Sequence, residues 1–150
     1  MAGILLDTNV LIYAHDAGEP AKQLRALEVL DRLHLTGTGQ LSAQCLGEFF
    51  SIAVRTRRPL LSPTDAAAQV ERLLQAWPVL DVTPLVVGEA IRGARTHRLP
   101  YWDAQVWATA RLNQTRVIFS EDFGSGVLDG IRFVNPFADD FNVETWAPLT

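Results

Sequence analysis

The sequence predicts an α/β fold with three layers, in which helices cover both faces of a parallel sheet. Short apolar runs that are typical of strands alternate along the chain with segments of helical apolar periodicity. This alternation favours a parallel sheet between two helical layers. The length of 150 residues is that of one domain, and 48% hydrophobic with 20% charged residues is an ordinary globular composition. We therefore expect a single domain over residues 1–150.

The N-terminal half contains two strand candidates. An apolar run at residues 4–6 ends in three polar side chains, after which helical periodicity continues to about residue 16. A break at residues 18–20 precedes an amphipathic helix that ends at residues 36–39. A short strand at 40–42 leads into a helix over about 43–57. Ser62 and Pro63 then indicate the start of a helix that runs to about residue 77.

The C-terminal half repeats the alternation. We expect a strand at 78–82, a helix from Pro84 to about residue 97, and a further helix over 101–113 after the Leu99-Pro100 break. A strand at 116–119 follows, and residues 120–126 have the composition of a loop. The last predicted strand is 131–134, and after residue 135 we expect a polar, partly ordered tail.

Composition excludes several classes of protein. The net charge of -4 argues against nucleic-acid binding through overall charge, so any such surface must be local. The single cysteine, Cys45, cannot form an internal disulfide, fits a reducing compartment and is expected to serve packing. No stretch approaches the length of a membrane span, and the N-terminus lacks a basic region ahead of an apolar core. We expect a cytoplasmic protein without a membrane partner.

Four carboxylates are predicted to meet at one edge of the sheet. Helices in such a fold run antiparallel to the strands, so strand ends and helix starts share an edge, where functional groups collect. Asp7 and Asp122 follow strands, whereas Glu48 and Asp103 lie early in helices. Each has a plain alternative: Asp7 could cap a helix, Glu48 could be a surface residue, Asp103 could favour a helix N-terminus, and Asp122 could belong to a turn.

Such a cluster predicts a divalent cation. Crowded carboxylates raise one another's pKa and resist ionisation unless a cation compensates them. Oxygen ligands favour Mg²⁺ or Mn²⁺, whereas zinc favours histidine and cysteine. The three histidines show no ligand spacing, and Cys45 has no second cysteine.

The motifs around these acids resemble those of the PIN-domain family, most closely the VapC-type toxins of bacterial toxin-antitoxin pairs. The similarity rests on Leu6-Asp7-Thr8-Asn9-Val10-Leu11, Leu46-Gly47-Glu48-Phe49, Tyr101-Trp102-Asp103-Ala104 and Ser120-Glu121-Asp122-Phe123. The resemblance implies a five-stranded parallel sheet of order 3-2-1-4-5 and places the four acids in one Mg²⁺ or Mn²⁺ site. Thr8, Asn9 and Ser120 match polar positions that support the site.

The resemblance also implies an activity. The expected reaction is metal-dependent hydrolysis of RNA by a toxin that inhibits translation or growth, with Asp7 and Asp103 as first candidates for direct ligands. Glu48 and Asp122 would complete the site or position the attacking water. A structured RNA with an exposed loop is the expected substrate. The family further implies a homodimer and a cognate VapB-type antitoxin.

Two arginine clusters are candidates for RNA phosphate binding, namely Arg55, Arg57 and Arg58, and Arg92, Arg95 and Arg98. Both could equally be solvated helix ends. A receiver domain would need a lysine at a strand end, where Lys22 is not predicted to lie, and a haloacid-dehalogenase-like phosphatase would need an aspartate at Asn9. The alternative that remains is a PIN-like RNA- or protein-binding module with little or no turnover.

Overall fold

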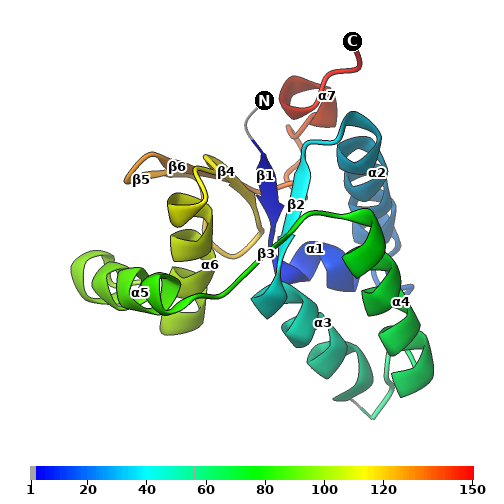
Figure 1. Cartoon of the computed structure of the whole chain (residues 1–150). Coiled ribbons are helices and arrows are strands. Elements are labelled where there is room, and N and C mark those ends of the chain that lie inside the picture. The colour runs from blue at the N-terminus through cyan, green and yellow to red at the C-terminus, as the bar shows by residue number, and fades with distance from the viewer. Residues whose placement is uncertain (1–2, 56) are drawn as a thin grey trace.

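The computed structural model describes residues 3–55 and 57–150, and within them a six-stranded sheet forms the centre (Figure 1). The strands are β1 (Ile4–Leu6), β2 (Gly39–Ser42), β3 (Val79–Leu80), β4 (Val117–Phe119), β5 (Gly126–Leu128) and β6 (Ile131–Val134). They are arranged in the order β3-β2-β1-β4-β6-β5, and all pairs are parallel except that of β5 with β6. The predicted order of five parallel strands is confirmed, with β6 in the fifth place.

Strand β5 was not predicted, because residues 120–126 were expected to form a loop up to the last strand. It pairs antiparallel with β6 through a two-residue turn, in which Asp129 and Gly130 have φ angles of 47° and 81°. Two positive φ angles match the twist of a tight hairpin, and Asp-Gly is a favoured sequence for it. The extra strand covers an edge of β6 that the predicted fold leaves open.

The helices up to residue 112 lie where the sequence predicted them, whereas the short helix at residues 143–146 was not predicted. They are α1 (Thr8–Tyr13), α2 (Pro20–Thr36), α3 (Ala43–Arg55), α4 (Pro63–Ala76), α5 (Pro84–His97), α6 (Tyr101–Leu112) and α7 (Val143–Trp146). Ser62 and Thr83 cap α4 and α5 with their hydroxyl groups, and Pro63 and Pro84 occupy the first turns. Helix α3 ends at Arg55, and Thr56 of its predicted C-terminus lies outside the described residues. None of the helices described is long and apolar enough to cross a membrane.

Two apolar cores lie on opposite faces of the sheet. In β1, Ile4 and Leu6 face the core beneath α1 to α4, whereas Leu5 faces the core beneath α5 and α6. Figure 1 shows these two groups of helices on either side of the sheet. Gly93 lets α5 approach α6 closely, because a Cβ atom there would lie 2.5 Å from the Trp107 ring.

The C-terminal tail is built into the fold, so the prediction of a polar, partly ordered segment was wrong. Helix α7 packs beside α2, and Val143 and Ala147 are buried in the first core. Arg32 of α2 donates a hydrogen bond to the Ala147 carbonyl over 3.2 Å. Apolar residues of the tail meet a surface that only the packed structure presents to them.

Candidate functional site

Asp7 lies at the joint between β1 and α1, and 6% of it is exposed. Its Oδ1 accepts a hydrogen bond of 2.8 Å from the Thr8 backbone N–H, so it does cap the helix. Its Oδ2 accepts a second bond, of 2.7 Å, from the Ser120 hydroxyl. The residue therefore fulfils the capping alternative and also contacts a residue that follows β4.

Burial raises the pKa of Asp7 to about 6. Burial is the largest cause, because it disfavours the charged form, and the nearby charges of Asp122 and Asp103 act in the same direction. The hydrogen bonds from Ser120 and Thr8 oppose the shift. A buried carboxylate with this pKa gains from any cation that enters the pocket.

Ser120 connects three of the predicted residues. It is fully buried at the end of β4, where the parallel register of Leu6 with Phe119 sets it beside Asp7. Its hydroxyl oxygen accepts hydrogen bonds from Asn9 Nδ2 over 3.0 Å and from the Asp122 N–H over 3.1 Å. Asn9 Nδ2 also donates to Asp122 Oδ2 over 3.2 Å. These bonds fix the loop that carries Asp122 against α1.

Glu48 and Asp103 reach the same pocket from two further helices. The Thr8 hydroxyl donates to Glu48 Oε1 over 3.0 Å, and Gln44 donates to the same oxygen over 3.3 Å. Asp103 lies in the first turn of α6. Burial raises its pKa, and the charges of Asp122 and Glu48 add to the rise.

All four acids line one pocket of about 380 Å³, together with Thr8 and Asn9. The structure thus brings the predicted acids together at the carboxyl edge of the sheet. Their catalytic and metal-binding roles stay a prediction.

Several lining residues were missed by sequence reasoning. Tyr13, Asp16 and Glu121 line the pocket as well, although none of them was among the predicted site residues. Helical spacing could have indicated Tyr13 and Asp16, since they lie about one and two turns after Asn9. The ammonium group of Lys22 lies 2.9 Å from Glu121, beside the pocket, which its place on the α2 surface did not suggest.

The donor set fits a hard cation, although the acids are not drawn tightly together. Within residues 3–55 and 57–150, no three histidine, cysteine, aspartate or glutamate side chains lie close enough to hold one ion. Mg²⁺ usually takes one or two carboxylates and keeps several waters, so it needs no such group. In the same part of the chain, the buried Asn9 Oδ1 has no hydrogen-bond partner and supplies a further oxygen at this edge.

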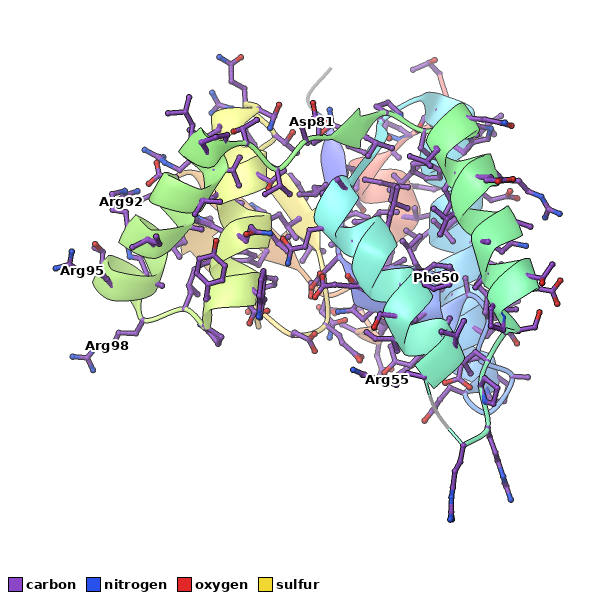
Figure 2. The ribbon with its side chains drawn as sticks, turned by 60° about the horizontal axis from the view of Figure 1, so that its bottom comes forward. Phe50, Arg55, Asp81, Arg92, Arg95 and Arg98 are labelled. Carbon is purple, nitrogen blue, oxygen red and sulfur yellow. The ribbon has the colours of Figure 1, made fainter. Side chains whose placement is uncertain are left out.

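The two arginine clusters lie in different places relative to the pocket. Arg92, Arg95 and Arg98 project from the outer side of α5 (Figure 2), and Arg92 is already paired with Glu89 and Asp129. Helix α6, which lines the pocket through Asp103 and Val106, lies between α5 and the sheet (Figure 1). The other cluster lies at the end of α3, where Arg55 (Figure 2) is one turn beyond Ile52 of the pocket wall. Arg57 and Arg58 follow it and are exposed.

Solved structures with a similar fold belong to toxin-antitoxin systems. A toxin-antitoxin complex from Klebsiella pneumoniae superposes with a TM-score of 0.64 at 17% identity, covering 89% of this chain and 98% of that one. VapC20 from Mycobacterium tuberculosis, a sarcin-ricin loop cleaving toxin, gives 0.63 at 22% identity, covering 87% and 99%. DNA-bound VapBC from Salmonella typhimurium gives 0.62 at 22% identity, covering 91% and 99%.

A comparison with curated protein sequences finds no match to this chain. The family model of the PIN domain matches residues 4–124, which span the sheet from β1 to β4 and all four acids. The chain therefore belongs to the PIN domain family, as its four acidic motifs had indicated.

Proposed function

We propose that this PIN domain is a metal-dependent endoribonuclease that hydrolyses RNA phosphodiester bonds and acts in the cytoplasm as the toxin of a toxin-antitoxin pair. The observation that carries the proposal is the convergence of Asp7, Glu48, Asp103 and Asp122 in one pocket, on four separate segments of the chain. Four acids have no evident structural reason to share a pocket where burial raises the pKa of Asp7 and Asp103 and repulsion from neighbouring acids adds to the rise. Binding a cation would relieve that repulsion.

Asp7 and Asp103 are the first candidates to hold Mg²⁺ or Mn²⁺. A bound ion would polarise the phosphoryl oxygens and supply hydroxide from water at neutral pH. Ser120 and Thr8 orient Asp7 through its two oxygens. Addition of Mg²⁺ should raise the melting temperature of the protein and leave that of an Asp7→Asn variant nearly unchanged, since binding to the native state alone stabilises it.

Glu48 and Asp122 are proposed to position the attacking water. Thr8 and Gln44 both bond to Oε1 of Glu48, so Oε2 has no hydrogen bond within the described residues. Asn9 holds Asp122 Oδ2 in place. Attack by water would leave a 5′-phosphate on one product, and a 2′,3′-cyclic phosphate on the other would contradict this route.

RNA can approach this acidic pocket through basic groups at its rim. Arg55 lies on the face of α3 that carries Glu48, because seven residues separate them, which is two helical turns. Lys22 lies beside the pocket, where it forms an ion pair with Glu121 of the lining. Arg57 and Arg58 add positive charge next to Arg55. The arginines of the second cluster, Arg92, Arg95 and Arg98, would contact only RNA that reaches beyond α6. A structured RNA with an exposed loop remains the proposed substrate.

The proposed partners are a VapB-type antitoxin and a second copy of the chain. The solved toxin-antitoxin complexes with this fold support the first. An apolar groove between α3 and α4, where Phe50 (Figure 2) and Leu74 are exposed, could take the apolar face of an amphipathic segment. A basic side chain of the antitoxin would then enter the acidic pocket.

Induction in a bacterial host that lacks the antitoxin tests the proposal. The chain is compared with Asp7→Asn at equal abundance, by growth and by mapping RNA ends. Growth arrest with discrete RNA cuts that the variant abolishes is the expected result, and the cut sites identify the RNA. Arrest by both proteins without cuts, or no effect of either, would contradict a toxin nuclease.

A binding module with little turnover is the second candidate. It is favoured by the observation that no three potential metal ligands are clustered in the described residues. Incubation of the purified protein with total RNA and Mg²⁺ or Mn²⁺ separates the two candidates. Retention of RNA without cleavage at either metal would favour the binding module.

A further inference from the structure

We propose that Trp102 is a stacking platform for an unpaired nucleobase of the RNA beside the cleaved bond. This inference rests on the proposed nuclease function and extends it to a positioning residue. Trp102 directly precedes Asp103 in the first turn of α6, and both side chains line the acidic pocket. A base that stacks on the indole therefore belongs to a nucleotide close to the phosphate at the acids.

Trp102 differs from the other tryptophans of the chain in its exposure. It is 62% exposed, whereas Trp107 is fully buried, and Trp77 and Trp146 pack against the first core. Exposed apolar residues are common on protein surfaces, so exposure alone would not indicate a function. The position of this ring at the rim of the pocket is what distinguishes it.

Neighbouring residues contact the indole of Trp102 and the backbone that carries it. Tyr101 packs edge-on against it with ring centroids 5.0 Å apart. The Trp102 carbonyl accepts a hydrogen bond of 3.0 Å from Gln44 Nε2. Gln44 is itself held by Gln105, which accepts a bond from the Tyr101 hydroxyl. The Tyr101 contact limits the ring and the Gln44 bond holds the backbone that carries it, so part of the ordering is in place before a base stacks on Trp102.

The lining of the pocket has an acidic part and an apolar part. The four acids form the first, and Ile12, Ile52 and Val106 belong to the second, with Val106 one helical turn after Trp102. Phosphate and metal chemistry belong to the acidic part, whereas a flat aromatic base suits the apolar part. Base pairs in a duplex are stacked on their neighbours, so only an unpaired nucleotide can place its base there.

The platform should accept any base. Gln44, whose side chain bonds to the Trp102 carbonyl, already uses its amide for Trp102, Glu48 and Gln105. Stacking uses the face of the base, which all four bases have, and is sequence-tolerant. Trp102 would thus select single-stranded RNA, and other contacts would read its sequence.

Direct binding tests the proposal without relying on cleavage. In an Asp7→Asn background with Mg²⁺, the affinity for an oligouridylate of about ten nucleotides, a length typical of such sites, is measured by fluorescence anisotropy of labelled RNA. Trp102→Leu should weaken binding about five- to a hundredfold, as expected for loss of one stacked base, and Trp102→Phe should retain most of the affinity. Oligoadenylate should show the same pattern.

A ribose-phosphate oligomer of the same length without bases is the matched control. The Trp102 protein should bind it weakly, and Trp102→Leu should cause no further loss. Equal affinity of Trp102→Leu and its parent for oligouridylate would overturn the proposal. Contact with a protein partner would then be the remaining explanation for the exposed ring. An equal loss for RNA with and without bases would also overturn it, because the substitution would then act through the fold.

These outcomes are separable from failure of the proposed function. A protein that binds RNA through Trp102 but does not cleave it with Asp7 present would support the platform and contradict the nuclease. A protein that cleaves RNA with a KM unaffected by Trp102→Leu would contradict the platform alone.

Discussion

Replacing Asp7 with asparagine should stabilise the fold at neutral pH while abolishing cleavage. The raised pKa means that the native state holds the charged carboxylate less readily than the unfolded chain does. Asparagine is nearly the same size and carries no charge, so it removes this cost. A gain in stability on loss of a catalytic group is expected where an active site keeps an unfavourable charge.

The pKa shift sets the size of the effect. A rise from 3.8 to about 6 corresponds to about 3 kcal/mol between the two protonation states. Asparagine cannot accept hydrogen bonds at both of its polar atoms, so one of the bonds from Ser120 and Thr8 weakens, at a cost of about 1 kcal/mol. The net gain in the free energy of unfolding is therefore about 2 kcal/mol at pH 7 and above.

The pH dependence has a definite sign. Between about pH 4 and pH 6 the native state binds more protons at Asp7 than the unfolded state, so native stability falls as pH rises through this range. The destabilisation is complete above the folded pKa and absent below the unfolded value. The advantage of Asp7→Asn should therefore be present at pH 7.5, shrink below pH 6 and turn into a small disadvantage near pH 4, where mainly the cost of the weakened hydrogen bond remains.

Urea unfolding followed by circular dichroism at several pH values, without divalent metal, measures these differences. Asp31→Asn is the matched control, since Asp31 is an exposed carboxylate on α2 and its substitution should change stability by less than about 0.5 kcal/mol. An Asp7→Asn protein no more stable than its parent at pH 7.5, or a gain that persists unchanged at pH 4, would refute the reasoning.

Three further predictions concern packing. Gly93→Ala should lower the free energy of unfolding by about 1–3 kcal/mol in the same urea experiment, because the added methyl group meets the buried Trp107 ring. Gly88→Ala is the control on the same helix. Its methyl group would meet open space, so this substitution should be neutral or stabilising. Cys45 is fully buried, and burial is the main cause that raises its pKa to about 12. Its thiol should therefore react with a thiol reagent at least about a hundredfold faster in denaturant than in the native protein. Equal rates in the two conditions would contradict its packing role. Val143→Ala should cost about 1–2 kcal/mol by calorimetry if the tail is packed, and an unchanged melting temperature would show that it is not.

Sequence alone was enough for most of the architecture and for the choice of the four acids, although β5 and α7 were not predicted. Periodicity is a local property, because it follows from the repeat of each helix or strand, so the order of elements can be predicted without tertiary contacts. The rule that strand ends and helix starts share an edge then brings Asp7, Glu48, Asp103 and Asp122 near one another. The two arginine clusters could also be recognised in the sequence, but nothing in the sequence sets their distance from that edge. The Asp129-Gly130 turn and its strand could also have been predicted from the sequence, although they were not.

The contacts that shape the site depend on the tertiary structure. Ser120 bonds to Asp7 across 113 residues because the parallel register of β1 with β4 places them side by side. Lys22 reaches Glu121, and Trp102 is braced by Gln44, only because separate helices pack around one pocket. Periodicity fixes which face of an element is buried, whereas register and helix packing decide which side chains meet. The raised pKa of Asp7 follows chiefly from its burial within this packing, and for that reason it was decided by the fold as a whole.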